Sequence, residues 1–442
     1  MNENIINASP TKELFISMLV KDLELKDAIG DLVDNSVDGA RRMRGNEKYN
    51  DLFIEIEAKK DYFKITDNCG GIPADLARDY AFRFGRPPNM PTITHSLGQF
   101  GIGMKRALFK LGKKFKIEST SINSRFTVEV DVDEWKKLTD WNFTFDDIEE
   151  DLLEKETKGK QGIIITVPDL HEDVAEQFKL ENFINELIKE LRYEQLYNIS
   201  KGLKITVNGN PLDAPQFKLL QSDCFKTLYH EETLDKGKIH VKIYAGASER
   251  DLDAGGWYIF CNDRLILGPE QSEITGWGVK KPTRIPKYHS QFDRSRGYVF
   301  FDADDASLLP LNTTKTNMDT DSRIFKRIRQ QMISLMRPII NFLNRLHDEG
   351  GQYQRQEIDD NPLERATDSA DLVELSNIET TKNKGIYGPK RSITTSRLKV
   401  GTIQYTKPLS EIEEAKQVLE VSTNKEVGKK TFEYFMEMEV NE

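Results

Sequence analysis

The chain has 442 residues, of which 31% are charged and 38% hydrophobic, and its formal net charge is −10. This length exceeds one hydrophobic core, so two or three domains are expected, and the acidic balance argues against a wholly basic nucleic-acid coat. Three cysteines occur far apart, so neither a disulfide framework nor a cysteine zinc site is indicated. The polar N-terminus and the lack of long apolar runs predict a cytoplasmic protein without membrane association.

The first part of the chain mixes helix and strand patterns. Apolar residues at helical spacing predict a helix that begins at Ser9-Pro10 and a second one over about residues 22–44. Alternating patterns predict strands at 53–58, 62–66, 115–119, 126–132 and 163–167. Further helices are expected near Pro73 and after Gly103, with a lid-like loop at 83–97 between them. Residues 1–177 are therefore expected to form one domain, with helices on one face of a mixed sheet.

The second part is expected to begin with a connecting helix over 178–199 and to end with a long helix over 322–347, interrupted or kinked near Pro338. Strands are predicted between these helices at 203–207, 239–244, 256–262 and 298–302. Residues 178–347 then form a second domain. Polar composition predicts a linker over 348–397, and returning apolar periodicity predicts a small docking module over 398–442.

The first chemical motif lies in the helix at 22–44. Asp31, Asn35 and Asp38 are spaced at i, i+4 and i+7, so they share one helical face. An amide oxygen at Asn35 is a suitable ligand for Mg²⁺, and a carboxylate one turn earlier can polarise a water molecule. A solvated acidic face is the alternative interpretation.

Two further motifs follow in order. In the first, Asp67 ends a strand and precedes Gly70 and Gly71, so its carboxylate can accept a hydrogen bond from an exocyclic amine while the backbone approaches a flat base. An ordinary strand-ending turn is the alternative. The second motif is the run Gly98-Gln99-Phe100-Gly101-Ile102-Gly103-Met104-Lys105, whose backbone N–H groups open a helix and can face phosphates.

As an ordered set, these motifs resemble those of the GHKL ATPase superfamily (gyrase B, heat-shock-ninety chaperones, histidine kinases and MutL), most closely its MORC-like branch. The resemblance implies an α+β protein in which a Bergerat-fold α/β sandwich precedes an S5-like transducer domain. It implies Mg²⁺-dependent hydrolysis of ATP to ADP and phosphate, with Asp31 as general base, Asn35 as metal ligand and Asp67 as adenine reader. The implied nucleotide-binding residues are Asn35, Asp38, Asp67, Gly71, Ile72, Gly98, Gln99, Phe100, Gly101, Ile102, Gly103, Met104 and Lys105.

The chain departs from the family pattern at two of these positions. Asp31 stands where most relatives carry glutamate, so either the helix lies closer to the nucleotide or turnover is slow. Cys69 replaces a glycine, which is tolerated only where the backbone does not need a positive φ.

The second domain adds to the resemblance. Residues 256–266 resemble a transducer strand, and Lys315 lies where that domain presents a loop lysine to the terminal phosphate. A plain surface lysine is the alternative. Relatives with this arrangement often dimerise when ATP is bound, so an ATP-dependent homodimer is expected.

A basic stretch suggests a further partner. The residues that could contact DNA phosphates are Lys280, Lys281, Arg284, Lys287, Arg294 and Arg296. A solvated charged face is the alternative. The sequence thus predicts an ATP-driven switch or clamp, with DNA or genome (antiviral) defence as one role. An ATP-gated scaffold or chaperone-like protein with little turnover, which binds a protein partner through its C-terminal module, is the other.

Overall fold

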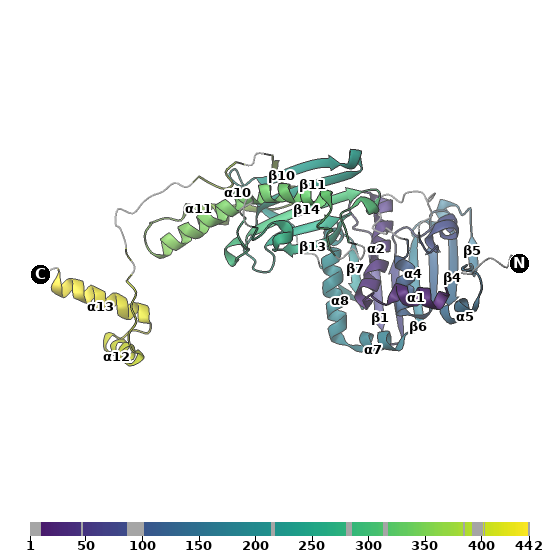
Figure 1. Ribbon diagram of the computed structural model, residues 1–442, viewed down its shortest axis with the longest axis horizontal. Helices are drawn as coiled ribbons and strands as arrows, with labels where there is room; N and C mark the ends of the chain where they lie inside the picture. The colour runs from purple at the N-terminus through teal and green to yellow at the C-terminus, as the bar shows by residue number, and fades with distance from the viewer. Residues whose placement is uncertain are drawn as a thin grey trace, which may run out of the picture. The chain divides into compact units, whose positions relative to one another are not determined.

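The computed structural model describes residues 10–45, 47–85, 101–213, 217–279, 285–312, 317–382, 385–390, 401 and 403–440 (Figure 1). The chain forms two compact units. The larger comprises Met1–Asp348 with Pro362–Arg391, and the smaller comprises Glu349–Asn361 with Ser392–Glu442. The described residues of the larger unit form an eight-stranded sheet and a six-stranded sheet, each with its own layer of helices, and a separate two-stranded sheet.

The first sheet has the strand order β5-β4-β3-β6-β2-β1-β7-β8. Its strands are β1 (Phe53–Lys59), β2 (Tyr62–Asp67), β3 (Gly112–Thr120), β4 (Arg125–Asp131), β5 (Asp147–Glu149), β6 (Gly162–Leu170), β7 (Lys204–Val207) and β8 (Asn210–Pro211). The pairing is antiparallel except between β1 and β7, which run parallel. The strands predicted for the first domain are all present in this mixed sheet.

One face of this sheet is buried and the other is polar. Ile54 and Ile56 of β1 and Phe63 and Ile65 of β2 are buried, whereas Glu55 is exposed between the first two. This alternation is typical of a sheet covered on one side. Helices α1 (Lys12–Val20), α2 (Leu25–Arg44) and α4 (Gly103–Leu111) lie against one another on the same side of the sheet (Figure 1). Burying each large apolar side chain contributes roughly 1.5–3 kcal/mol, and this layer holds α2 in place.

The remaining helical segments of this region are short, apart from α8. They are α3 (Ala74–Leu76), the π-helical turn η1 (Ala77–Ala81), α5 (Val132–Lys137), α6 (Glu154–Thr157), α7 (Glu172–Lys179), α8 (Glu181–Glu194) and α9 (Leu196–Ser200). The connecting helix predicted over 178–199 is therefore divided among α7, α8 and α9. Helices α8 and α9 are separated at Gln195. The side chain of Gln195 is fully buried, and its Nε2 donates to the Asp34 carboxylate at 2.9 Å.

Two further expectations about the first domain are corrected. Helix α1 begins later than predicted and is capped by Thr11, whose hydroxyl accepts from the Leu14 N–H at 3.3 Å. Ser9 lies outside the described residues. The strand predicted at 203–207 was assigned to the second domain, but β7 pairs with β1 in the first sheet. A short strand carries no mark of which sheet it joins, because its partner is chosen by long-range packing.

The second sheet has the order β13-β12-β14-β11-β10-β16, and β9 pairs separately with β15. The elements of this region, in chain order, are β9 (Lys218–Gln221), β10 (Thr227–Leu234), η2 (Asp235–Gly237), β11 (Ile239–Ala247), β12 (Gly256–Cys261), β13 (Arg264–Glu270), η3 (Glu273–Thr275), η4 (Ser290–Phe292), β14 (Ser295–Ala303), η5 (Ala306–Leu308), α10 (Arg323–Gln354), α11 (Pro362–Asp368), β15 (Asp371–Glu374) and β16 (Thr380–Thr381). Every residue of β12 is buried, because Trp257 and Ile259 face the core shared with α10 while Tyr258 and Phe260 face a second cluster.

Two expectations about the later chain are corrected. Helix α10 is not interrupted at Pro338 and continues to Gln354, while the alternative of a kink there stays a prediction. The segment predicted to be a polar linker instead contributes structure over residues 362–382 and 385–390. Leu363 and Tyr387 are buried in the second core. Strand β15 pairs with β9, and β16 pairs with β10. Isolated anchors and edge strands leave little periodicity in a polar sequence, which explains the error.

The smaller unit contains the helices α12 (Leu409–Leu419) and α13 (Asn424–Glu439), which contact each other. Thr423 caps α13 and forms a reciprocal capping box with Glu426. Large apolar side chains remain exposed on both helices, including Val418 at 77% and Phe435 at 54%. No helix in the described ranges combines the length and apolarity that crossing a membrane requires.

Candidate functional site

Helix α2 carries the acidic motif, and its acids are buried rather than solvated. Asp31 and Asp38 are only 5% and 8% exposed. A buried carboxylate without compensating partners is costly, so acids in such positions are normally paired. The alternative of a wetted acidic face is therefore wrong for these two residues.

Asp31 connects α2 with α4. The Arg106 guanidinium donates from Nε to the Asp31 Oδ2 at 2.7 Å, and its Nη2 lies 2.6 Å from the same oxygen in an ion pair. The first residue of α4 is also close, because a Cβ built on Gly103 would stand 3.3 Å from the same oxygen. The expected base and the end of the expected phosphate loop therefore lie next to each other.

Asn35 has unmet hydrogen-bonding capacity. Its Nδ2 is shielded from solvent and has no hydrogen-bond partner among the described residues. Leaving such a donor unpaired costs about 1–3 kcal/mol, which an acceptor such as a phosphate or water oxygen would recover. The amide oxygen Oδ1 is the atom that could bind a metal ion. Within the described ranges, no group of three or more His, Cys, Asp or Glu residues is arranged to hold a metal. A Mg²⁺ ion at Asn35 would thus take its other ligands from phosphate and water, as this ion commonly does.

Asp67 ends β2 and is joined to α2 through Ser36, the neighbour of Asn35. The Ser36 hydroxyl donates to the Asp67 Oδ2 at 2.6 Å, and the N–H groups of Cys69 and Ile163 donate to Oδ1 at 2.8 and 3.3 Å. Burial raises the pKa of Asp67 above its usual 3.8, and these hydrogen bonds oppose that shift. The carboxylate is consequently fixed in orientation, as a group that reads a base must be.

The turn after Asp67 uses its glycines as predicted. The positive φ values fall on Gly70 (95°) and Gly71 (67°) and not on Cys69, so a cysteine is tolerated in place of the family glycine. A Cβ on Gly71 would stand 2.1 Å from the Thr120 carbonyl oxygen. Ser119 of β3 then secures the next residue, accepting from the Ile72 N–H at 2.7 Å and donating to the Ile72 carbonyl at 3.0 Å.

The glycine loop is described only at its end. Gly98, Gln99 and Phe100 lie outside the described residues, whereas Gly101 has a φ of 63° and Ile102 precedes the first residue of α4. Met104 follows within α4 and is partly buried against the first core. The described part of the loop therefore ends beside Asp31.

Lys105 does not face outward as expected of a phosphate ligand. It is 2% exposed, and its ammonium donates to the carbonyl oxygens of Ala81 (2.9 Å) and Gly101. Burial lowers the pKa of Lys105 from 10.5 to about 7. Through these contacts Lys105 links Ala81, which precedes residues 86–100, with Gly101, which follows them.

Lys315 lies outside the described residues. The positions on either side of residues 313–316 are held together, since the Asn312 N–H donates to the Asn317 carbonyl at 2.9 Å and Leu311 pairs with Met318. The role of Lys315 stays a prediction.

Two of the three described residues of the expected basic surface, Arg294 and Arg296, are turned inward and not toward solvent. Arg296 is 4% exposed and donates to the carbonyl oxygens of Asp293 and Ser295 at 2.5 and 3.0 Å. Arg294 contacts the Ser248 carbonyl and a glutamate of α11, so both arginines are structural. A charge count cannot separate such residues from exposed ones. Lys287 is exposed, while Lys280, Lys281 and Arg284 lie outside the described residues.

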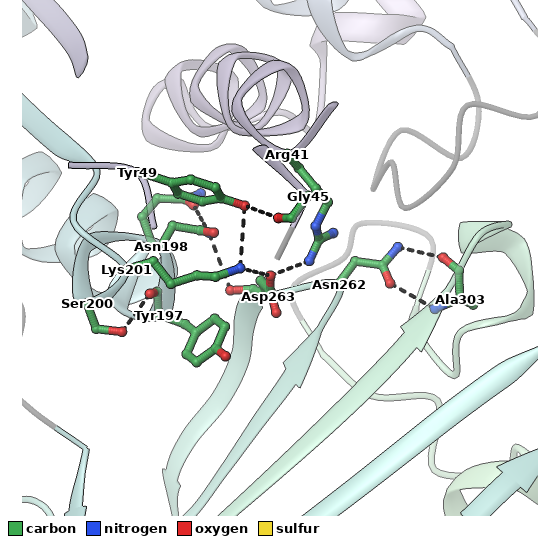
Figure 2. Close-up of polar contacts among 11 residues, drawn as sticks. Arg41, Gly45, Tyr49, Tyr197, Asn198, Ser200, Lys201, Asn262, Asp263 and Ala303 are labelled. Carbon is green, nitrogen blue, oxygen red and sulfur yellow. Dashed lines mark hydrogen bonds and ion pairs between the residues drawn. The ribbon is translucent and has the colours of Figure 1, made fainter. Parts of the chain in front are cut away.

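The tip of the β12–β13 hairpin joins the second sheet to the first domain (Figure 2). Asn262 and Asp263 form its turn with φ values of 46° and 66°, which suits a tight two-residue hairpin. The Asp263 carboxylate lies 2.5 Å from the Arg41 guanidinium of α2 and 3.2 Å from the Lys201 ammonium. The hairpin tip is thus held by Arg41 near the end of α2 and by Lys201 directly after α9.

The next residue extends this junction. Arg264 is buried and forms ion pairs with Asp34 on α2 and Glu194 on α8. Burial raises the pKa of Glu194 from 4.5 to about 7, with Arg264 opposing the shift and the Asp34 charge adding to it. Sequence reasoning missed this junction, as it missed Ser36 and Ser119. The available signal was an uninterrupted polar run, Asn262 to Arg264, between two apolar strands.

The comparison with known families agrees with this geometry. Residues 23–160 match the family model described as histidine kinase-, DNA gyrase B-, and HSP90-like ATPase. The matched range contains α2, the turn after β2 and the start of α4, and it does not reach the second sheet. A search of curated proteins found no match. The match supports the GHKL superfamily and an ATP-binding function, without distinguishing among the branches of that superfamily.

Proposed function

Taking a GHKL-type nucleotide site as the premise, we propose that this chain binds Mg²⁺ and ATP along α2 and hydrolyses the ATP to ADP and phosphate. The nucleotide contacts α2, the turn after β2 and the start of α4. Asn35 holds the metal, Asp67 accepts a hydrogen bond from the adenine amine, and Asp31 is the general base.

One observation carries this proposal: α2 brings the three motifs together. Asp31 contacts α4, and one turn later Ser36 contacts Asp67. Asn35 lies between these contacts, and its Nδ2 has no partner among the described residues. A buried amide donor without a protein partner is available to an acceptor on a ligand.

The chemistry follows from these groups. A water molecule attacks the terminal phosphorus, the bond from phosphorus to the bridging oxygen breaks, and ADP departs with the electron pair. The Asp31 carboxylate accepts the proton that the water loses. When bound, Mg²⁺ would neutralise phosphate charge, which is its usual contribution to phosphoryl transfer.

Calorimetry and a phosphate-release assay test the proposal. Folded wild-type protein should bind ADP and a non-hydrolysable ATP analogue in the presence of Mg²⁺ and should release phosphate from ATP. Asp31→Asn should lower turnover on the order of a hundredfold or more, as expected for loss of a general base. Asp140→Asn, a change at an exposed acid, is the matched control. Absence of nucleotide binding by folded wild-type protein would refute the proposal.

A second candidate is an ATP-gated scaffold with little turnover. The pairing of Asp31 with Arg106 favours it, because a base oxygen that accepts one N–H group and is ion-paired with a second nitrogen is engaged. The same assays separate the two functions: a scaffold binds nucleotide tightly, and its phosphate release is equal in wild type and Asp31→Asn.

Partner binding is a further part of the proposal. We expect ATP to drive homodimerisation, and the exposed apolar residues of α12 and α13 favour docking of a protein partner there. The MORC-like role at DNA now depends on Lys287 with Lys280, Lys281 and Arg284, since Arg294 and Arg296 are structural. Light scattering with and without the ATP analogue, repeated with DNA at low salt, tests these interactions.

A further inference from the structure

Arg106 and Lys105 are adjacent cations in the first turn of α4, and they have opposite environments. Lys105 is buried against backbone carbonyl oxygens, whereas the Arg106 side chain is 21% exposed and forms an ion pair with Asp31. Nε of Arg106 donates to one oxygen of that carboxylate, and Nη2 lies at ion-pair distance from the same oxygen. Arg106 is therefore the cation of α4 that faces the proposed base.

This pairing conflicts with the work of a general base. A base must use a carboxylate oxygen to accept a proton from water, yet the Asp31 Oδ2 already accepts the Nε–H of Arg106 and is ion-paired with its Nη2. The described contacts thus represent an arrangement in which Asp31 is held and not free to act through that oxygen. Turnover through Oδ2 would require the guanidinium to move to another anion.

A phosphate is the natural competitor for this guanidinium. Arginine pairs with phosphate in two-pronged geometry at least as well as with carboxylate. Arg106 lies one turn from Gly103, where the glycine loop meets the helix, and the N-terminus of a helix favours anions. A terminal phosphate bound at the start of α4 would lie about one helical turn from Arg106, whereas ADP lacks that phosphate.

We infer that Arg106 is a positioning and specificity residue that exchanges Asp31 for the terminal phosphate of ATP and so distinguishes ATP from ADP. The inference rests on the proposed function. In the absence of the terminal phosphate, Arg106 holds Asp31. When the terminal phosphate binds the Arg106 guanidinium, the Asp31 carboxylate is released and can accept the proton from water.

Calorimetric titration with Mg²⁺ and either ADP or a non-hydrolysable ATP analogue tests this inference. Arg106→Gln should weaken binding of the ATP analogue about tenfold or more while ADP affinity stays within about twofold. Arg106→Lys should restore part of the loss. Lys110→Gln, a charge-removing change one turn further along the same helix, is the matched control and should leave both affinities unchanged.

A second arm uses the competing partner. Asp31→Asn weakens the pair that the phosphate must break, so it should tighten binding of the ATP analogue about threefold without changing ADP affinity. Adding Arg106→Gln to Asp31→Asn should abolish that gain. This arm decides the question if Arg106→Gln alone fails to fold.

The outcomes distinguish a failure of the Arg106 exchange from a failure of the proposed function. Equal loss of ADP and ATP-analogue affinity in Arg106→Gln, or no loss of either, overturns the exchange and leaves nucleotide binding intact. Unchanged ATP-analogue affinity in Asp31→Asn overturns it as well. If wild-type protein binds neither nucleotide, the proposed function itself fails.

Discussion

Arg264 on β13 forms a buried ion pair with Asp34 on α2, the residue directly before Asn35. The two residues are 230 positions apart in the chain. Helix α2 therefore carries both the residues of the proposed nucleotide site and a residue that contacts β13 of the second sheet. A movement of α2 on nucleotide binding would therefore change the ion pair between Asp34 and Arg264.

Replacing Arg264 with methionine should destabilise the protein by about 3–5 kcal/mol, because two buried carboxylates would then lack their shared cation. Chemical denaturation measures the free energy of unfolding. Arg125→Met is the control, since its pair with Glu149 is exposed and should contribute within about 1 kcal/mol. Equal effects of the two changes would show that Arg264 does not hold the domains together.

The pKa of Glu194 predicts a pH dependence. Burial raises that pKa from 4.5 to about 7, so the folded state binds a proton that the unfolded state has lost between these values. The stabilisation is complete below about pH 4.5 and is lost as the pH rises to 7, with a total of at most about 3 kcal/mol. Glu194→Gln should remove this component, visible as a flatter dependence of unfolding free energy on pH. A parallel curve for the variant would contradict the assignment.

Asn35 should make nucleotide affinity depend on metal. Wild-type protein is expected to lose affinity for the ATP analogue when EDTA removes Mg²⁺, because a bridge between the Asn35 amide and the phosphates is lost. Asn35→Ala should bind the analogue weakly, and EDTA should not weaken it further. Retained metal dependence in the variant would show that another group holds the ion. Asn142→Ala, at an exposed position, serves as the control.

Lys105 predicts the opposite pH trend to Glu194. Burial lowers the pKa of Lys105 to about 7, so between pH 7 and 10.5 the unfolded state binds a proton that the folded state does not. Stability should therefore rise with pH across this window. Lys105→Met should lose that rise, measured as the difference in unfolding free energy between wild type and variant. A constant difference over the window would mean that the folded protein keeps Lys105 charged.

The three motifs were predictable because each is local. Helical spacing alone places Asp31, Asn35 and Asp38 on one side of α2. A positive φ calls for glycine, so the turn at Gly70 and Gly71 is visible in the sequence. The strands and the order of the motifs follow from such short-range patterns, and the family match at residues 23–160 contains them.

The pairing of charges was not predictable, because it depends on which surfaces meet. One residue along a helix turns a side chain by about 100°, which separates the buried Lys105 from Arg106 at the site. Likewise, Arg296 and Arg264 look like any other arginines until burial assigns their partners. The sequence by itself determined where the nucleotide motifs lie, since helix periodicity and turns are encoded by neighbouring residues. Only the tertiary structure decided that Arg106 holds Asp31 and that Arg264 joins the domains, since those contacts form between segments that folding brings together.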